Sequence, residues 1–382
     1  MVPDGAARPP ALRIAVVYPR GPVSHSTIHA MDTLRWLRMA EGLADRGFHV
    51  DLIVDGPGDL AGSRPTLGVV PWANVEWSRY DVVKTLFHEG FRRFMEAGGA
   101  GHPFVISKLG SVVGPADDVA GVHFSGEERR ELWEIQRAIH RHARYVTVLT
   151  DASRALWEST LGRDVPVLLV PTGVDRHIPA PRANPYPAGG ERIVVYVGTL
   201  YQRQQSSINL LWQGRLNALG RRLRARGLRL YAVGPGRADR IDREAVTVVG
   251  PVGHDAVWDY QHFADVGVAL AQGPVQHNES SKLYYYLRTG LPVVSEAPIP
   301  NNRLLEESRG GLIAPYGDDD ALAEMVEAAA HRSWDRARAI RYVLASHTWD
   351  SRVRIYQDLL AAELGARQRP EAGSVDVSPP VG

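Results

Sequence analysis

Short apolar runs rich in β-branched residues alternate with longer amphipathic segments along the first half of the chain. The run RIAVVYP, at residues 13–19, has the uninterrupted apolar character of a buried strand. In residues 33–47, leucines recur on one helical face, Gly47 ends the predicted helix, and the strand HVDLIVD follows. The strand PFVIS, a helix over about residues 126–143 and the strand YVTVLT continue this pattern. Such βαβ repetition predicts a mostly parallel sheet with helices on both faces.

A segment rich in proline and glycine, RHIPAPRANPYPAGGE at residues 176–191, interrupts the alternation and is typical of an interdomain linker. The alternation then resumes with RIVVYVG, LRLYAVG, VTVVG, VGVALA, PVVSE and GLIAP as predicted strands. Three helical segments close the chain, near residues 319–330, 333–345 and 349–364. The second half therefore repeats the architecture of the first.

The pattern predicts an α/β protein with two Rossmann-like domains that face each other across a cleft. We place the first domain at residues 1–175 and the second at residues 192–348, with the linker 176–191 between them. Each domain would offer a binding surface at the C-terminal ends of its strands. Residues 365–382 show no periodicity, and we expect them to form a disordered tail.

The amino-acid composition excludes or disfavours several classes of function. The chain has 382 residues, a formal net charge of +1 and no cysteine, which excludes disulfides, thiolate metal sites and cysteine nucleophiles. The balanced charge does not favour nucleic acid as a partner, and no His/Asp cluster has metal-ligand spacing. The sequence shows neither a signal peptide nor a run of apolar residues long enough to span a membrane. We expect a cytoplasmic protein, with peripheral membrane contact left open.

Two strand-to-helix junctions in the second half have the residues of an anion site. The stretch YVGTLYQRQQSS places Gly198, Thr199 and Arg203 after one strand, and VGPGRADR places Gly234 and Arg237 after the next. Glycine lets the backbone approach a ligand, and a helix that starts there offers free N–H donors. Glycine at such a junction also serves simply to turn the chain, so each junction alone is a weak signal.

A third junction, NESSKLYYYLRTGLPVV at residues 278–294, carries Lys282 in the first turn of a predicted helix. A cation there is disfavoured by roughly 0.3–1 kcal/mol because the helix dipole makes this end positive. Either Lys282 points into water, or an anionic ligand offsets the cost. The three junctions together place Arg203, Arg237 and Lys282 at the same edge of one sheet, which favours a diphosphate ligand.

The segment KLYYYLRTGLPVV resembles the KLYEYLAAGKPVV signature of nucleotide-sugar-dependent glycosyltransferases with the GT-B fold, the group 1 or family 4-like enzymes. VPTGVD, YVGTLY and SHTWDSRVRIYQDLL resemble other segments of that family in the right order, from about residue 14 to residue 364. The resemblance implies a GT-B fold whose last helix, residues 349–364, crosses back to the first domain. It also implies that Lys282 and the loop after the first strand of the second domain hold the donor diphosphate.

The sequence departs from that family at several positions. Tyr285 stands where members carry a glutamate that holds the donor ribose, so its hydroxyl contacts the ribose or its ring simply packs. His277 stands where retaining members carry another glutamate, and Glu279 lies close by. We count His277, Glu279, Ser281 and Tyr285 among the donor-site candidates, together with Gly21 after the first strand.

The first domain should supply the acceptor side and any general base. Related inverting enzymes place a catalytic aspartate just after the strand that corresponds to PFVIS, but SKLGS follows here without a carboxylate. Asp117, Asp118 and His123 lie further along and are candidates by location. A carboxylate or a neutral histidine there could deprotonate an acceptor hydroxyl.

We therefore expect an enzyme that moves a sugar, as a hexosyltransferase does, from a nucleoside-diphosphate sugar to a hydroxyl of a glycan, a lipid-linked sugar or a natural product. The resemblance implies a metal-independent reaction without a cofactor beyond this co-substrate. Two alternatives stay open: a sugar-nucleotide epimerase of the same fold, and a catalytically silent subunit that binds nucleotide or a partner.

Overall fold

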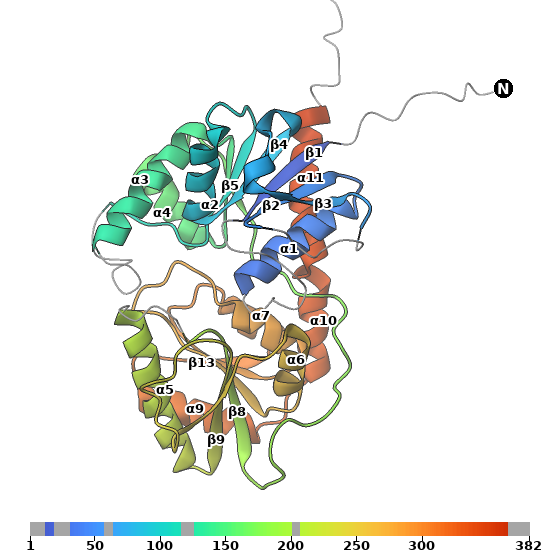
Figure 1. The fold of residues 1–382 in the computed structure, drawn as a ribbon. Helices are drawn as coiled ribbons and strands as arrows, with labels where there is room; N and C mark the ends of the chain where they lie inside the picture. Colours follow the sequence, from blue (N-terminus) through green and yellow to red (C-terminus); the bar gives the residue numbers. More distant parts are fainter. Residues whose placement is uncertain (1–11, 19–30, 57–63, 116–125, 201–206, 366–382) are drawn as a thin grey trace, which may run out of the picture.

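The computed structural model describes residues 12–18, 31–56, 64–115, 126–200 and 207–365, which form two α/β domains, one above the other in Figure 1. The strands of the described residues lie in two sheets, with the order β3-β2-β1-β4-β5-β6-β7 in the first domain and β10-β9-β8-β11-β12-β13 in the second. The paired strands are parallel throughout both sheets. This is the two-domain GT-B architecture that the sequence predicts.

Helices cover both faces of the first-domain sheet, which explains why its central strands are apolar at nearly every position. Ile14 and Val16 of β1 pack into the cluster under α1 and α11, and Ala15 and Val17 pack into the opposite cluster. The elements of this domain are β1 (Arg13–Val17), α1 (Met31–Ala44), β2 (His49–Val54), β3 (Leu67–Pro71), β4 (Val82–Leu86), α2 (Phe87–Phe94), β5 (Val105–Lys108), α3 (Gly126–His142), β6 (Tyr145–Val148), α4 (Asp151–Leu161) and β7 (Val167–Leu169).

The second domain repeats this arrangement around a shorter sheet. Its apolar core, on the α5 and α9 side, is formed by alternate residues of the strands together with these two helices. The elements are β8 (Arg192–Val197), α5 (Ser207–Arg224), β9 (Leu228–Val233), β10 (Val246–Gly250), α6 (His254–His262), β11 (Val266–Ala269), α7 (Ser281–Arg288), β12 (Val293–Glu296), α8 (Arg303–Ser308), β13 (Gly311–Ala314), α9 (Asp319–His331) and α10 (Arg336–Ser346). Helix α11 (Trp349–Gly365) follows.

The last helix returns to the first domain. Helix α10 packs on α7 and α8, whereas α11 packs on α1 and runs along the first domain (Figure 1). The Arg46 side chain donates to the Gln357 side chain at 2.8 Å and to the Asp350 carboxylate at 2.7 Å. The Tyr356 and Thr147 hydroxyls lie 3.1 Å apart. The resemblance implied this crossing.

Two segments that cross between the domains therefore lie side by side. The N–H of Val174 donates to the His347 carbonyl at 2.9 Å, and the N–H of Trp349 donates to the Val174 carbonyl at 3.0 Å. Gly173 lies so close to the second crossing that a Cβ atom on it would be 2.7 Å from the Trp349 nitrogen. The domains are thus joined by a doubled connection that has no room for a larger residue at position 173.

Most predicted elements are present, and the differences are local. The helix predicted from residue 333 begins at Arg336, because the Asp335 side chain caps it by accepting from the Arg338 N–H at 2.9 Å. The sequence analysis did not identify β3, β4 and β7. Residues 176–191 contain no helix or strand, and the domain boundaries set around them stay predictions. The predicted tail lies outside the described residues, apart from Gly365 at the end of α11.

Within the described part of the chain, every helix is too short or too polar to cross a membrane.

We expect Gly173→Ala to lower the free energy of unfolding by about 1–3 kcal/mol, because the added methyl group would overlap the Trp349 backbone as well as its indole ring. Gly189→Ala is the matched control, since a Cβ atom there would have no neighbour within 4 Å, and we expect it to change stability by less than about 0.5 kcal/mol. Urea denaturation of the two variants measures both values. If the two variants were equally stable, the two crossing segments would not be closely packed at Gly173.

Candidate functional site

The turns that follow β8 and β9 lie against each other at the C-terminal edge of the second-domain sheet. The Gly198 N–H donates to the Val233 carbonyl at 2.9 Å, and the Leu200 N–H donates to the Pro235 carbonyl at 2.7 Å. Gly234 is packed directly on the Gly198 backbone. The first two predicted junctions, including Thr199, therefore form one continuous surface.

Arg237 follows this surface and forms an ion pair of 2.7 Å with Asp239. Its side chain is 46% exposed. The Arg237 charge is therefore balanced locally, and its contact with a diphosphate stays a prediction. Arg203 lies outside the described residues.

Lys282 is the second residue of α7 and lies in its first turn, as the sequence predicts. Its ammonium is 4.9 Å from the ring centre of Tyr196 and 5.9 Å from that of Trp212, an arrangement that permits cation–π attraction. No carboxylate among the described residues forms an ion pair with it. Burial lowers the pKa of Lys282 to about 8. The ammonium therefore lies against these rings, and the residue as a whole is half-buried.

Gly198 makes room for this lysine. A Cβ atom on Gly198 would lie 2.9 Å from both Cε and Nζ of Lys282, so a side chain at this position would displace the ammonium. The residue before α7, Ser280, makes no side-chain cap, and Ser281 follows as the first residue of the helix. The third predicted junction thus meets the first, and the ammonium lies between a helix N-terminus and the glycine turn.

The segment that precedes α7 contacts the first domain. The His277 carbonyl accepts from the hydroxyls of Thr150 at 2.5 Å and Ser153 at 3.0 Å. The Asn278 amide donates to the Ser111 hydroxyl at 2.7 Å. Both ring nitrogens of His277 are buried without a hydrogen-bond partner among the residues that the structure describes. The segment holds the two domains together in a closed arrangement, and a contact of His277 with the donor stays a prediction.

Glu279 is the most fully engaged residue of this segment. Its carboxylate accepts from the Thr172 N–H at 2.6 Å, from the Thr172 hydroxyl, and from the Tyr284 hydroxyl at 2.9 Å. Arg35 of the first domain lies 3.5 Å from the same carboxylate. In this arrangement Glu279 binds protein groups of both domains, and its contact with a donor sugar stays a prediction.

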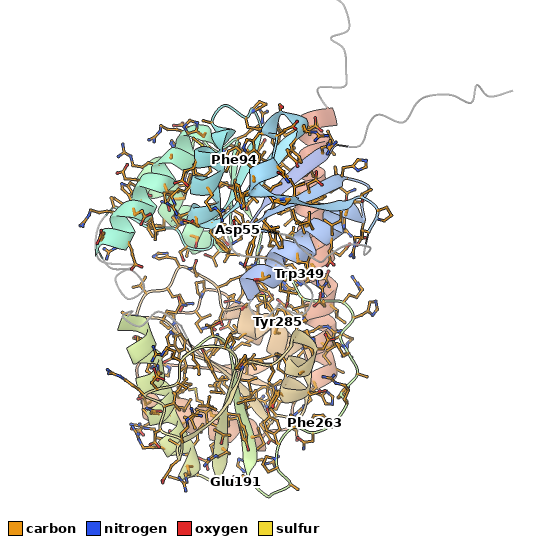
Figure 2. The ribbon with its side chains drawn as sticks, in the orientation of Figure 1. Asp55, Phe94, Glu191, Phe263, Tyr285 and Trp349 are labelled. Carbon is orange, nitrogen blue, oxygen red and sulfur yellow. The ribbon has the colours of Figure 1, made fainter. Side chains whose placement is uncertain are left out.

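Tyr285 packs, which is one of the two alternatives left open by the sequence. Its ring is stacked on Trp258 with centres 5.3 Å apart and an interplanar angle of 15°. The side chain is buried, and by geometric criteria its hydroxyl has no hydrogen-bond partner in the described part of the chain. Tyr285 and Trp349 both lie at the junction of the two domains (Figure 2). Burial raises the pKa of Tyr285, so the hydroxyl stays protonated.

The remaining candidates, Gly21, Asp117, Asp118 and His123, lie outside the described residues, and their roles stay predictions. The sequence analysis missed Tyr196, Trp212, Thr150, Ser153 and Thr172. Tyr196 belongs to the apolar run RIVVYVG, where the pattern indicates only a buried strand. Over the described ranges, no three His, Asp or Glu side chains come together in a way that could hold a metal ion.

Comparisons with known proteins identify this architecture. The family model described as "Glycosyl transferases group 1" matches residues 191–331, most of the second domain. A search of curated protein sequences finds no match.

Solved structures with the same fold cover nearly the whole chain. Sucrose-phosphate synthase from Thermosynechococcus elongatus is 18% identical, with a TM-score of 0.67 over 92% of this chain and 100% of that one. Anabaena HepE in complex with UDP-glucose is 13% identical, with a TM-score of 0.68 over 92% and 100%. WaaG, a glycosyltransferase involved in lipopolysaccharide biosynthesis, is 15% identical, with a TM-score of 0.57 over 95% and 100%. Residues 191–331 are therefore similar to glycosyl transferases group 1, and the chain as a whole has the GT-B fold.

Proposed function

We propose that the protein transfers a sugar from a nucleoside-diphosphate sugar to an acceptor hydroxyl, with the donor on the second domain and the acceptor on the first. The Lys282 ammonium carries this proposal, because it lies at a helix N-terminus, against the Gly198 turn, and without a counter-ion among the described residues. A diphosphate would supply the missing negative charge and the hydrogen-bond acceptors.

Lys282 suits the chemistry of the leaving group. In glycosyl transfer the sugar acquires oxocarbenium character while negative charge builds on the departing group, here a diphosphate. A cation held in place before the reaction stabilises that charge without reorganisation. The rings of Tyr196 and Trp212 fix the lysine side chain in this position. The N–H groups at the start of α7 would add to the same effect.

The closed arrangement of the domains fits this reaction. The segment 276–280 joins the second domain to Thr150, Ser153 and Thr172 of the first. Closure around a bound donor would exclude water and so suppress hydrolysis of the donor. Product release would then require these contacts to separate, a step that limits turnover in many enzymes.

The first donor to test is a UDP-hexose, because the HepE structure of similar fold is a complex with UDP-glucose. Turnover of such a donor that requires an added acceptor supports transfer. Product formed from donor alone supports the epimerase alternative, and nucleotide binding without any turnover supports the silent-subunit alternative.

Lys282→Met should weaken the binding of a nucleoside diphosphate by about 1.5–3 kcal/mol, roughly ten- to a hundredfold, because it removes a charged interaction while it keeps the apolar stem. Calorimetric titration with UDP, GDP and dTDP measures the change. Arg192→Gln is the control: it also removes one positive charge, but Arg192 begins β8 at the opposite edge of the sheet and pairs with Asp265. Unchanged affinity in Lys282→Met for every diphosphate that the wild type binds would refute the proposed site.

The affinity for a nucleoside-diphosphate sugar should fall as pH rises above about 8, the pKa of Lys282 in the unliganded protein. Below that pH the ammonium is already charged. Above it, binding requires proton uptake, and the affinity declines by up to about tenfold per pH unit until the higher pKa of the complex is reached. UDP-glucose is a suitable probe because its diphosphate diester does not titrate between pH 7 and pH 9. Lys282→Met should remove the dependence, and a dependence that persists in this variant would assign it to another group.

An inverting reaction requires a base in the first domain, and we propose that Asp117, Asp118 or His123 supplies it. Replacing the base, by Asp117→Asn, Asp118→Asn or His123→Ala, should lower turnover by a factor on the order of 10²–10⁴ and leave donor affinity unchanged. Steady-state kinetics beside calorimetry separates these effects. If all three variants turn over like the wild type, none of these residues is the base.

A further inference from the structure

A small pocket of about 10 Å³, room for about one water molecule, lies on the α1 and α11 side of the first-domain sheet, close to the crossing segments. Three cationic side chains, Arg35 from α1, Lys84 from β4 and Lys108 from β5, line it together. The rest of the lining is apolar or aromatic and consists of Met39, Leu86, Val170, Pro171, Trp349 and Tyr356. Buried cations are ordinarily paired with carboxylates, so the composition of this pocket is unusual.

Lys84 is the clearest anomaly. Its side chain is only 2% exposed, and no described residue accepts a hydrogen bond from its ammonium. The ammonium lies over the Tyr356 ring, with Nζ 5.1 Å from the ring centre, which permits cation–π attraction. A charged group that loses water without gaining an acceptor is strongly disfavoured, and burial beside Arg35 accordingly lowers the pKa of Lys84 to about 7.

The two neighbouring cations are also incompletely satisfied. Within the described ranges, the Nε of Arg35 is buried without a partner, although the other end of its guanidinium contacts Thr172 and Glu279. The Lys108 ammonium donates to the Leu109 carbonyl at 2.6 Å and to no other described residue. Burial, together with repulsion from Arg35 and Lys84, holds the pKa of Lys108 well below its usual value. Glu279 is the one carboxylate in the described part of the chain that offsets this charge.

The backbone next to these lysines is strained. Phe87, directly after β4, has a φ of +60°, a conformation that large side chains rarely adopt. Its ring faces the Lys108 ammonium, 5.5 Å from Nζ. Strain of this kind is concentrated at functional sites. The strained residue Phe87 therefore lies beside the incompletely paired cations.

We propose that this pocket binds a phosphate group, and that the acceptor of the sugar carries it. The first part rests on the unpaired cations around the pocket: a dianion would offset their excess over Glu279 better than a single carboxylate would. Once the lining side chains move apart to admit it, the dianion would accept hydrogen bonds from Lys84 Nζ and Arg35 Nε. The second part rests on the proposed function. It follows from the position of Lys108 at the C-terminal end of β5, beside the segment 276–280 that joins the donor domain.

Calorimetric titration of the full chain with inorganic phosphate at pH 7 tests the pocket. We expect the wild type to bind phosphate and Lys84→Met to bind it at least tenfold more weakly, because methionine keeps the packing on Tyr356 without the charge. Arg192→Gln, which removes one positive charge at the N-terminal end of β8, is the matched control and should bind phosphate as the wild type does. In Lys282→Met the part of the binding that depends on Lys84 should remain, which separates the pocket from the predicted donor site. Wild type that binds no phosphate, or equal binding by Lys84→Met, would overturn the proposal.

Thermal unfolding checks that the variants are folded and provides a second readout. Without phosphate, Lys84→Met should melt no lower than the wild type, since it removes a buried unpaired charge. Phosphate should raise the melting temperature of the wild type but not that of the variant. If Lys84→Met is unfolded, Lys108→Met takes its place in the same titrations, with the same outcomes required.

A phosphorylated sugar distinguishes an acceptor group from free phosphate. We expect glucose 6-phosphate to compete with inorganic phosphate and neutral glucose not to compete; failure of the sugar phosphate to compete would restrict the pocket to the free ion. The same proteins are titrated with UDP. Phosphate binding that depends on Lys84, in a protein that binds no nucleoside diphosphate, would reject the proposed function and retain the pocket. UDP binding without phosphate binding would reject only the pocket.

Discussion

Buried positive charge without an equal negative charge is the constraint on which both proposed sites depend. Arg215 shows the alternative, because it donates two hydrogen bonds to the fully buried Glu296, one of them at 2.7 Å, and the same carboxylate accepts from the Ala271 N–H at 2.6 Å. That pair is complete within the protein and holds strand ends together. Lys282 and Lys84 have no such partner among the described residues, and for this reason we propose them, and not Arg215, as ligand-binding groups.

The sequence predicted the fold well because strands that are buried on both faces are apolar throughout. Such an apolar run can be recognised in the sequence without knowledge of the neighbouring strands. Lys282 could also be placed, since its position in a helical first turn is a local property. Strand β4 was missed for the opposite reason. Its sequence VVKTL contains Lys84 in the middle, and a charged residue in a five-residue run hides the apolar pattern. Lys84, which interrupts the apolar pattern of β4, is also the residue that makes the neighbouring pocket unusual.

The parts of the site that the sequence could not predict depend on contacts between distant segments. Glu279 looked available for a donor sugar, but Thr172, 107 residues earlier in the chain, binds its carboxylate through both its N–H and its hydroxyl. Tyr285 differs from the expected glutamate, and only the position of Trp258 on α6 shows that its ring packs. No local spacing encodes either contact, because both arise when elements from separate parts of the chain meet.

A single carboxylate connects the two cationic sites. Glu279 offsets Arg35, which lines the first-domain pocket, and it lies three residues before Lys282. If a donor sugar drew Glu279 away, Arg35 would lose its counter-ion, and a phosphate group in the pocket would restore the balance. Binding at the two sites would then be mutually favourable, and linkage requires the effect of each ligand on the other to be equal. An acceptor that carries a phosphate would in this way be favoured once the donor is bound, which would protect the donor from water until both substrates are present.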